Sequence, residues 1–186
     1  SGSGLTLADP GGGYWRYVKR FPTMREARLW APGPGPIIAD TSLGRVGLMI
    51  CADLLDRRSW RDLRGQVDLV AVSAAWPVYT QPPEHVPLPL RRLTAAPFLA
   101  ADDYRQVLLP MGARAVGAPV LFVNATGPFV GHASFGGGSS LYDAEGRLLL
   151  EAGAEAELMS HRQPPRRAPQ EPFSHAPRWR AVLGVH

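Results

Sequence analysis

The sequence predicts an α/β layered fold, and three observations support this. Apolar strand-like runs alternate with helical segments along most of the chain, a pattern typical of a sheet covered by helices. The run DLVAVSAAW, over 68–76, is nearly all apolar, as expected when both faces of a sheet are covered. Turn sequences such as Asp-Ala-Glu-Gly, over 143–146, join later strands into hairpins.

The first part of the chain is predicted to be mainly β-structure. Residues 5–20 form two strands joined by the turn DPGGG, and residues 21–36 form a turn-rich connection. The runs PIIADTS and RVGLMIC, which Leu-Gly separates, predict a hairpin. A short helix is expected over 57–65, directly before the apolar strand.

The second part of the chain combines irregular and regular segments. Six prolines between residues 77 and 97 argue against regular structure there, and so long a loop within a compact domain is usually functional or disordered. Residues 98–117 predict a helix that Pro110 weakens or kinks. The strand APVLFVNAT, a glycine-rich loop at 136–138, the hairpin SSLYDAEGRLLLEAG and a last strand near 156–159 follow.

The composition indicates one globular domain followed by a tail. The chain has 186 residues, of which 45% are apolar, enough to bury a sizeable core. We expect a domain over 1–161 and an extended tail, rich in proline and arginine, over 162–186.

The charge and hydropathy of the chain bear on its partners. No apolar stretch reaches the roughly 18–20 residues that span a bilayer, so we expect no membrane partner. The net charge is +4, but the arginines are spread along the chain without a basic stripe interleaved with aromatic residues. We therefore expect no nucleic-acid partner.

The cysteine and histidine content bears on disulfides, metals and compartment. The chain has one cysteine, which excludes an internal disulfide and fits a reducing, cytoplasmic environment. The five histidines are scattered, and no CxxC or comparable zinc spacing is present. Neither a metal nor another cofactor is implied.

Two residues that occur once each indicate thiol chemistry. Cys51 ends an apolar strand where the chain turns, and Lys19, the only lysine, has Glu26 downstream. A sulfur nucleophile, an ammonium and a carboxylate are the parts of a thiol-dependent acyl-transfer site. Each residue also has a plainer interpretation: Cys51 as a small core residue, Lys19 as a solvated surface side chain, and Glu26 as a partner of Arg25 or Arg28.

Six segments resemble those of a known family in order and spacing, from about residue 5 to residue 159. They are LADPGGGYWRYVKRFP, EARLWAPG, GRVGLMICAD, VDLVAVSAAWP, APVLFVNATG and FGGGSSLYDAEGRLLLEAGAEAEL. The chain is similar here to the nitrilase, or carbon–nitrogen hydrolase, superfamily. The resemblance implies an α-β-β-α layered sandwich that is N-terminally incomplete, of which this chain holds the larger C-terminal portion. The first strands and the general-base glutamate of the family are expected outside these residues.

The resemblance also implies roles for individual residues. Cys51 matches the catalytic nucleophile, and Lys19 matches the cation that stabilises the negative oxygen of the tetrahedral intermediate. The backbone N–H of Ala52 would be the second donor to that oxygen. Glu26 matches the second acidic residue, which helps to hold the site together.

Three other residues have less direct roles. Trp76 is expected to line the substrate pocket, with simple core packing as the open alternative. Asp53 is expected to order the elbow that follows the strand, or to cap the next helix, rather than to act on substrate. Asn124 is expected to be structural.

The function that the resemblance implies is hydrolysis of a non-peptide carbon–nitrogen bond, an amide or N-carbamoyl bond, through a thioester on Cys51. Cys-Ala-Asp at 51–53 favours the amidase branches, with a small-molecule amide as substrate and a homo-oligomer as the assembly. Two alternatives stay open. One is a glutaminase domain that supplies ammonia to a synthetase, and the other is a non-catalytic relative or fragment that acts as a binding module. Without the general-base glutamate, the isolated chain is expected to be inactive.

Overall fold

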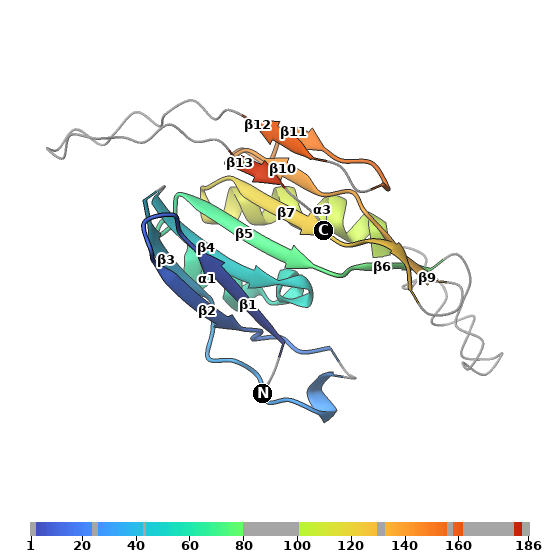
Figure 1. Cartoon of the computed structure of the whole chain (residues 1–186), viewed down its shortest axis with the longest axis horizontal. Helices are drawn as coiled ribbons and strands as arrows, with labels where there is room; N and C mark the ends of the chain where they lie inside the picture. Colours follow the sequence, from blue (N-terminus) through green and yellow to red (C-terminus); the bar gives the residue numbers. More distant parts are fainter. Residues whose placement is uncertain are drawn as a thin grey trace, which may run out of the picture.

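A computed structural model of the protein describes residues 3–23, 26–42, 44–79, 101–129, 133–155, 158–161 and 181–183. A six-stranded sheet lies at the centre, with helices against one face and a β-hairpin against the other (Figure 1). This α/β layering agrees with the predicted fold class. The described residues supply the helix layer, the main sheet and part of a second sheet.

The hairpin of the outer layer is formed by β1 (Gly4–Ala8) and β2 (Tyr14–Val18), which pair antiparallel. The expected strand–turn–strand over 5–20 is therefore confirmed. Its turn needs glycine, because Gly12 has a φ of 90°, a left-handed conformation that side chains disfavour.

The main sheet has the strand order β11-β10-β7-β5-β4-β3. Its strands are β3 (Ile37–Thr41), β4 (Gly44–Ile50), β5 (Leu69–Ala74), β7 (Val120–Asn124), β10 (Ser140–Tyr142) and β11 (Leu148–Glu151). The central strands β4, β5 and β7 are parallel, and the outer strands pair antiparallel. Both predicted hairpins of this sheet, β3–β4 and β10–β11, are confirmed.

The helices provide the crossovers between the parallel strands. They are the 3₁₀ helix η2 (Cys51–Leu55), α1 (Arg57–Leu63) and α3 (Ala101–Val116). Helix α1 ends two residues before the predicted limit, and α3 continues through Pro110 as one helix. Gly47 of β4 permits close packing of α1, since a Cβ atom there would lie 2.8 Å from a methyl carbon of Leu63.

The two faces of the main sheet have separate cores. Helices α1 and α3 pack on Met49, Val70, Val72, Val120 and Phe122 of one face. On the other face, Leu5, Leu7 and Trp15 of the hairpin pack around Ala39, Val46 and Leu48.

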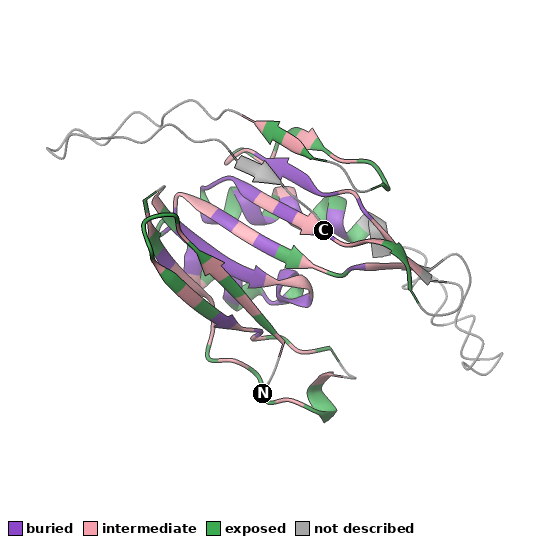
Figure 2. Ribbon diagram, viewed as in Figure 1, coloured by how far each residue is buried: buried purple, intermediate pink, exposed green. Residues whose placement is uncertain are grey.

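The second face is covered only in part by the described residues. Strand β4 is buried through most of its length, but β5 alternates between buried and more exposed residues (Figure 2). Ser73 is exposed, and Ala71 is half-buried. On the second face, Leu69 and Ala71 pack against the second core but Ser73 does not, so the prediction that the strand over 68–76 is covered on both faces is wrong at Ser73. The hairpin contacts β4 and β3 instead.

A small sheet that was not predicted follows β5. It has the order β6-β9-β8 and consists of β6 (Pro77–Tyr79), β8 (Thr126–Pro128) and β9 (Ala133–Gly136). The expectation of irregular structure from residue 77 onward is thus wrong for 77–79, and residues 80–97 lie outside the described residues. Pro77 is compatible with a strand because β6 is an edge strand and Pro77 is its first residue.

The remaining elements are short. The 3₁₀ helix η1 (Glu26–Arg28) lies in the connection after β2. Strand β12 (Met159–His161), close to the predicted last strand, pairs antiparallel with β13 (Ala181–Leu183). Apart from β13, the tail predicted over 162–186 lies outside the described residues.

Candidate active site

Cys51 occupies a strained elbow between β4 and η2. Its φ of +45° is the only positive φ among the non-glycine residues that the structure describes. Such a conformation costs on the order of 1–3 kcal/mol and persists only where the surrounding structure enforces it. The elbow directs the chain from a sheet strand into a helical turn, as the position of Cys51 in the sequence predicts.

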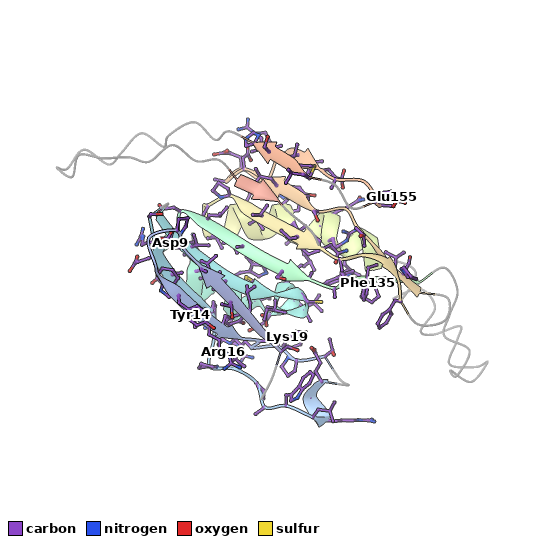
Figure 3. The ribbon with its side chains drawn as sticks, viewed as in Figure 1. Asp9, Tyr14, Arg16, Lys19, Phe135 and Glu155 are labelled. Carbon is purple, nitrogen blue, oxygen red and sulfur yellow. The ribbon has the colours of Figure 1, made fainter. Side chains whose placement is uncertain are left out.

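Lys19 follows β2 directly and is almost fully buried, with 4% of its side chain exposed. Figure 3 places it at the opposite end of the β1–β2 hairpin from Asp9, which lies by the turn. The interpretation of Lys19 as a solvated surface lysine is therefore wrong. Burial of a charged ammonium is costly unless a partner compensates for it.

Glu26 is that partner. Its Oε2 lies 2.6 Å from the Lys19 Nζ, and it also accepts hydrogen bonds from the Ser3 hydroxyl and the Thr23 N–H, both at 2.7 Å. Burial alone would raise the pKa of Glu26, but the hydrogen bonds from Lys19, Thr23 and Ser3 outweigh it and lower that pKa to about 2. Glu26 is consequently a carboxylate at neutral pH and fixes the Lys19 ammonium.

The Cys51 sulfur lies where β4 and β5 end. These strands are parallel neighbours, so their carboxyl ends meet at one edge of the sheet. The backbone N–H groups of Ala75, just after β5, and of Ala52 lie close enough to the sulfur to favour the thiolate. Burial raises the pKa of the Cys51 thiol, while the charge of Lys19 and these N–H groups oppose that rise.

Asp53 completes the elbow. Its side chain is fully buried and accepts three hydrogen bonds: from the Tyr17 hydroxyl at 2.7 Å, the Phe21 N–H at 2.7 Å and the Ile50 N–H at 2.8 Å. Of the two expected structural roles, ordering the elbow is confirmed. The next helix is capped instead by Asp56, which accepts from the N–H of Arg58.

The structure brings together four of the five residues that the sequence predicted for the site: Cys51, Ala52, Lys19 and Glu26. Trp76 is buried in the main core, against which Cys51 also packs, and its part in lining a substrate pocket stays a prediction. The backbone N–H of Trp76 donates to the Asn124 Oδ1 at 2.7 Å. Asn124 therefore connects the end of β7 to the residues that follow β5, which is the structural role expected of it.

Sequence reasoning missed the contribution of Ala75. A backbone N–H is present in every residue except proline, so no side-chain pattern could have indicated it. The parallel pairing of β4 with β5 is the only signal that places Ala75 beside the sulfur.

Other classes of site are limited by what the structure shows. Within the described ranges, no group of three His, Cys, Asp or Glu side chains could hold a metal ion. In the same ranges, no helix is both long enough and apolar enough to cross a membrane.

Residues 3–166 match the sequence profile of the carbon-nitrogen hydrolase family, so the chain belongs to that family. No curated protein matches the chain. The fold is similar to that of several solved structures, and the chain spans about half the length of those it matches.

Three of these structures are informative. A carbon-nitrogen hydrolase from Helicobacter pylori G27 has 20% identity and a TM-score of 0.66, over 83% of this chain and 53% of its own. A superfamily protein from Xanthomonas campestris, with an arsenic adduct in its active site, has 22% identity and a TM-score of 0.61, over 82% and 53%. A mutant of the amidase from Nesterenkonia sp. AN1 has 25% identity and a TM-score of 0.61, over 83% and 52%. That amidase carries the acetamide moiety of fluoroacetamide on its active-site cysteine.

Proposed function

We propose that this chain is the nucleophile-bearing part of an amidase-type carbon–nitrogen hydrolase, which cleaves a small-molecule amide or N-carbamoyl bond through a thioester on Cys51. One observation carries the proposal: the only thiol sits on a strained elbow near the buried Lys19 ammonium, which pairs with Glu26. Strain of this kind clusters at active sites. The amidase from Nesterenkonia supports the choice of a simple amide as the substrate class.

The first step would be attack of the Cys51 sulfur on the carbonyl carbon, while the thiol proton passes to a general base. A C–S bond forms, and the π electrons of the carbonyl move to its oxygen. The Lys19 ammonium and the Ala52 N–H would stabilise that negative oxygen. Donors fixed in advance in a site shielded from water are each worth about 10²–10³-fold in rate.

The second step would release the nitrogen. The C–N bond breaks, the nitrogen leaves with a proton as ammonia or an amine, and the acyl group stays on Cys51 as a thioester. Water then attacks the thioester, the C–S bond breaks, and the sulfur regains a proton. Both steps need a group that accepts and returns protons.

Glu26 is poorly suited to that proton transfer. A general base works best with a pKa near the working pH, and the pKa of Glu26 is lowered to about 2. Its part would be to orient Lys19. We therefore propose that the base is a glutamate outside these 186 residues, as the family resemblance implies.

Assembly and compartment are further parts of the proposal. Exposed apolar side chains at helical spacing on α3, Tyr104, Val107 and Met111, support a homo-oligomer. The single free cysteine supports a reducing, cytoplasmic setting. The glutaminase and binding-module alternatives remain, but a module without chemistry would not need a strained cysteine.

The experiment is to incubate the 186-residue chain with an activated acetyl ester and, separately, with acetamide. We expect intact-protein mass spectrometry to show an acetyl adduct on Cys51 and none on the Cys51→Ser variant, which lacks the sulfur. We expect no sustained release of ammonia from acetamide. Absence of the adduct would contradict the role of Cys51. Steady ammonia release would show that the general base lies within the chain.

A further inference from the structure

The carboxylate of Asp53 connects the two halves of the proposed site. Two of its three donors, the Tyr17 hydroxyl and the Phe21 N–H, lie two residues before and two residues after Lys19. The third donor, the Ile50 N–H, lies one residue before Cys51. A single buried side chain therefore holds the backbone after the lysine, the Tyr17 side chain before it, and the backbone that leads into the nucleophile.

The backbone hydrogen bonds of Lys19 itself do not reach the elbow that carries Cys51. Its N–H donates to Ser3, and its carbonyl accepts from Gly33, in both cases away from the elbow. Arg20 also links the two regions, through ion pairs with Asp56 at 3.4 Å and with Asp62 at 2.5 Å, but these reach helix α1 and its cap, beyond the elbow. The three hydrogen bonds of Asp53, at 2.7–2.8 Å, are the connection to the elbow itself.

The connection through Tyr17 is stable against changes of pH. Tyr17 is fully buried, and its oxygen donates to Asp53 while accepting from the Arg20 N–H at 3.0 Å. Burial, with the negative charge of Asp53, raises the pKa of Tyr17 well above its usual range. The phenol therefore stays protonated and remains a donor to Asp53.

We propose that Asp53 is a positioning residue that sets the Lys19 ammonium at its working distance from the Cys51 sulfur. The inference rests on the proposed function, since it gives Asp53 a role only through Cys51 and Lys19. Asp53 does not touch substrate in this account. Its three hydrogen bonds fix the relative placement of the hairpin end and the elbow.

The sign of one measurable change distinguishes positioning from a simple charge effect. The charged groups that act on Cys51 are Lys19, which favours the thiolate, and Glu26, which opposes it. If Asp53 acted only as a nearby negative charge, Asp53→Asn would make the thiolate easier to form. If Asp53 positions Lys19, the same substitution lets the ammonium move away and makes the thiolate harder to form.

The experiment is the pH profile of alkylation by iodoacetamide, in which Cys51 is the only reacting thiol because it is the only cysteine. Four variants of the full chain are compared with the unchanged chain: Asp53→Asn, Tyr17→Phe, Lys19→Met and Asp68→Asn. Asp68 is the matched control, because it accepts a hydrogen bond from the N–H of Arg45 in the same strand, β4. Circular dichroism at the labelling temperature establishes that each variant is folded.

We expect Asp53→Asn and Tyr17→Phe to raise the midpoint of the profile by about one pH unit, which lowers the labelling rate at neutral pH by up to about tenfold. Lys19→Met should raise it at least as much, and Asp68→Asn should leave it unchanged. Tyr17→Phe keeps the ring and alters no charge, so it carries the test alone if Asp53→Asn does not fold.

Failure of the inference differs from failure of the proposed function. Suppose first that Lys19→Met raises the midpoint of the alkylation profile. A midpoint that is unchanged or lower in Asp53→Asn then overturns the positioning role. If Asp53→Asn does not fold, an unchanged midpoint in Tyr17→Phe overturns it. A midpoint that Lys19→Met leaves unchanged contradicts the proposed role of Lys19 and removes the basis of the inference as well.

Discussion

Strand β4 has an aspartate bound to its backbone near each end, and the two differ in surroundings. Near the amino end, Asp68 accepts the Arg45 N–H at 2.9 Å, with 37% of its side chain exposed. At the carboxyl end, Asp53 accepts the Ile50 N–H at 2.8 Å, is fully buried and accepts two further hydrogen bonds. The bonds to the strand are nearly the same length.

The difference shows that burial, rather than bond length, decides what a carboxylate does. Water can replace the partners of Asp68 if they separate, so little is lost. The Asp53 carboxylate is shielded from water, and the fully buried Tyr17 hydroxyl would stay unsatisfied without it. The carboxyl end of β4 is consequently the more firmly held of the two, and this is the end that carries the nucleophile.

The largest expected effect concerns the chemistry at the buried end. Cys51→Ala removes the only thiol, so we expect complete loss of acylation by an activated acetyl ester, measured by intact-protein mass spectrometry. Asp68→Ala at the other end should be acylated at the unchanged rate. An acyl adduct on Cys51→Ala would break the contrast between the two ends.

The next effect concerns the cation. Lys19→Arg should slow acylation of Cys51 by about 10²–10³-fold, because a planar guanidinium cannot replace a compact ammonium in a fitted site. Stopped reactions followed by mass spectrometry would give the rate. Arg45→Lys, at the exposed end, exchanges the same pair of residues and should change nothing. Equal effects of the two exchanges would contradict the proposed site.

The third effect concerns stability. Asp53→Ala leaves one fully buried donor, the Tyr17 hydroxyl, and two partly buried N–H groups without their acceptor, so we expect it to lower the free energy of unfolding by about 3–5 kcal/mol. Asp68→Ala should lower it by less than about 1 kcal/mol. Urea denaturation measures both, and similar losses would show that burial does not separate the two aspartates.

The smallest effect concerns pH. The pKa of Glu26 is lowered from 4.5 to about 2 in the folded chain. A lowered folded pKa means that its stabilisation is fully present above pH 4.5 and is lost as the pH falls towards 2. Glu26→Gln should therefore cost about 1–2 kcal/mol at neutral pH, allowing for screening by water, and the difference should shrink to near zero at about pH 2. Urea denaturation at several pH values tests this, and a difference that persists at pH 2 would contradict the ion pair.

Much of the fold could be predicted because its signals are local. Gly12 in the first turn and the sequence DAEG at 143–146 indicate hairpins, and the apolar run before Cys51 indicates a buried strand. The strands β6, β8 and β9 could not be predicted, since each has only three or four residues and β6 pairs with the distant β9. The exposure of Ser73 was missed for a related reason. The sequence of β5 does not indicate how far the β1–β2 hairpin extends over the sheet.

The candidate site follows the same division. Cys51 and Lys19 were evident as residues that occur once, and their family resemblance assigned the roles. The backbone N–H of Ala75 and the hydrogen bonds of Asp53 to Tyr17 and Phe21 depend on tertiary contact between segments more than 20 residues apart in each direction. Sequence spacing alone does not encode such contacts.

The left-handed backbone of Cys51 has a consequence for how such a protein could change over evolution. Glycine adopts a φ of +45° freely, so Cys51→Gly would remove strain on the order of 1–3 kcal/mol. It would lose the burial of a small side chain, about 1 kcal/mol by area. The exchange is close to neutral for folding, and selection for a stable fold alone would not retain a cysteine at the elbow. A lineage released from its chemistry would therefore be expected to lose the sulfur before it lost the sheet.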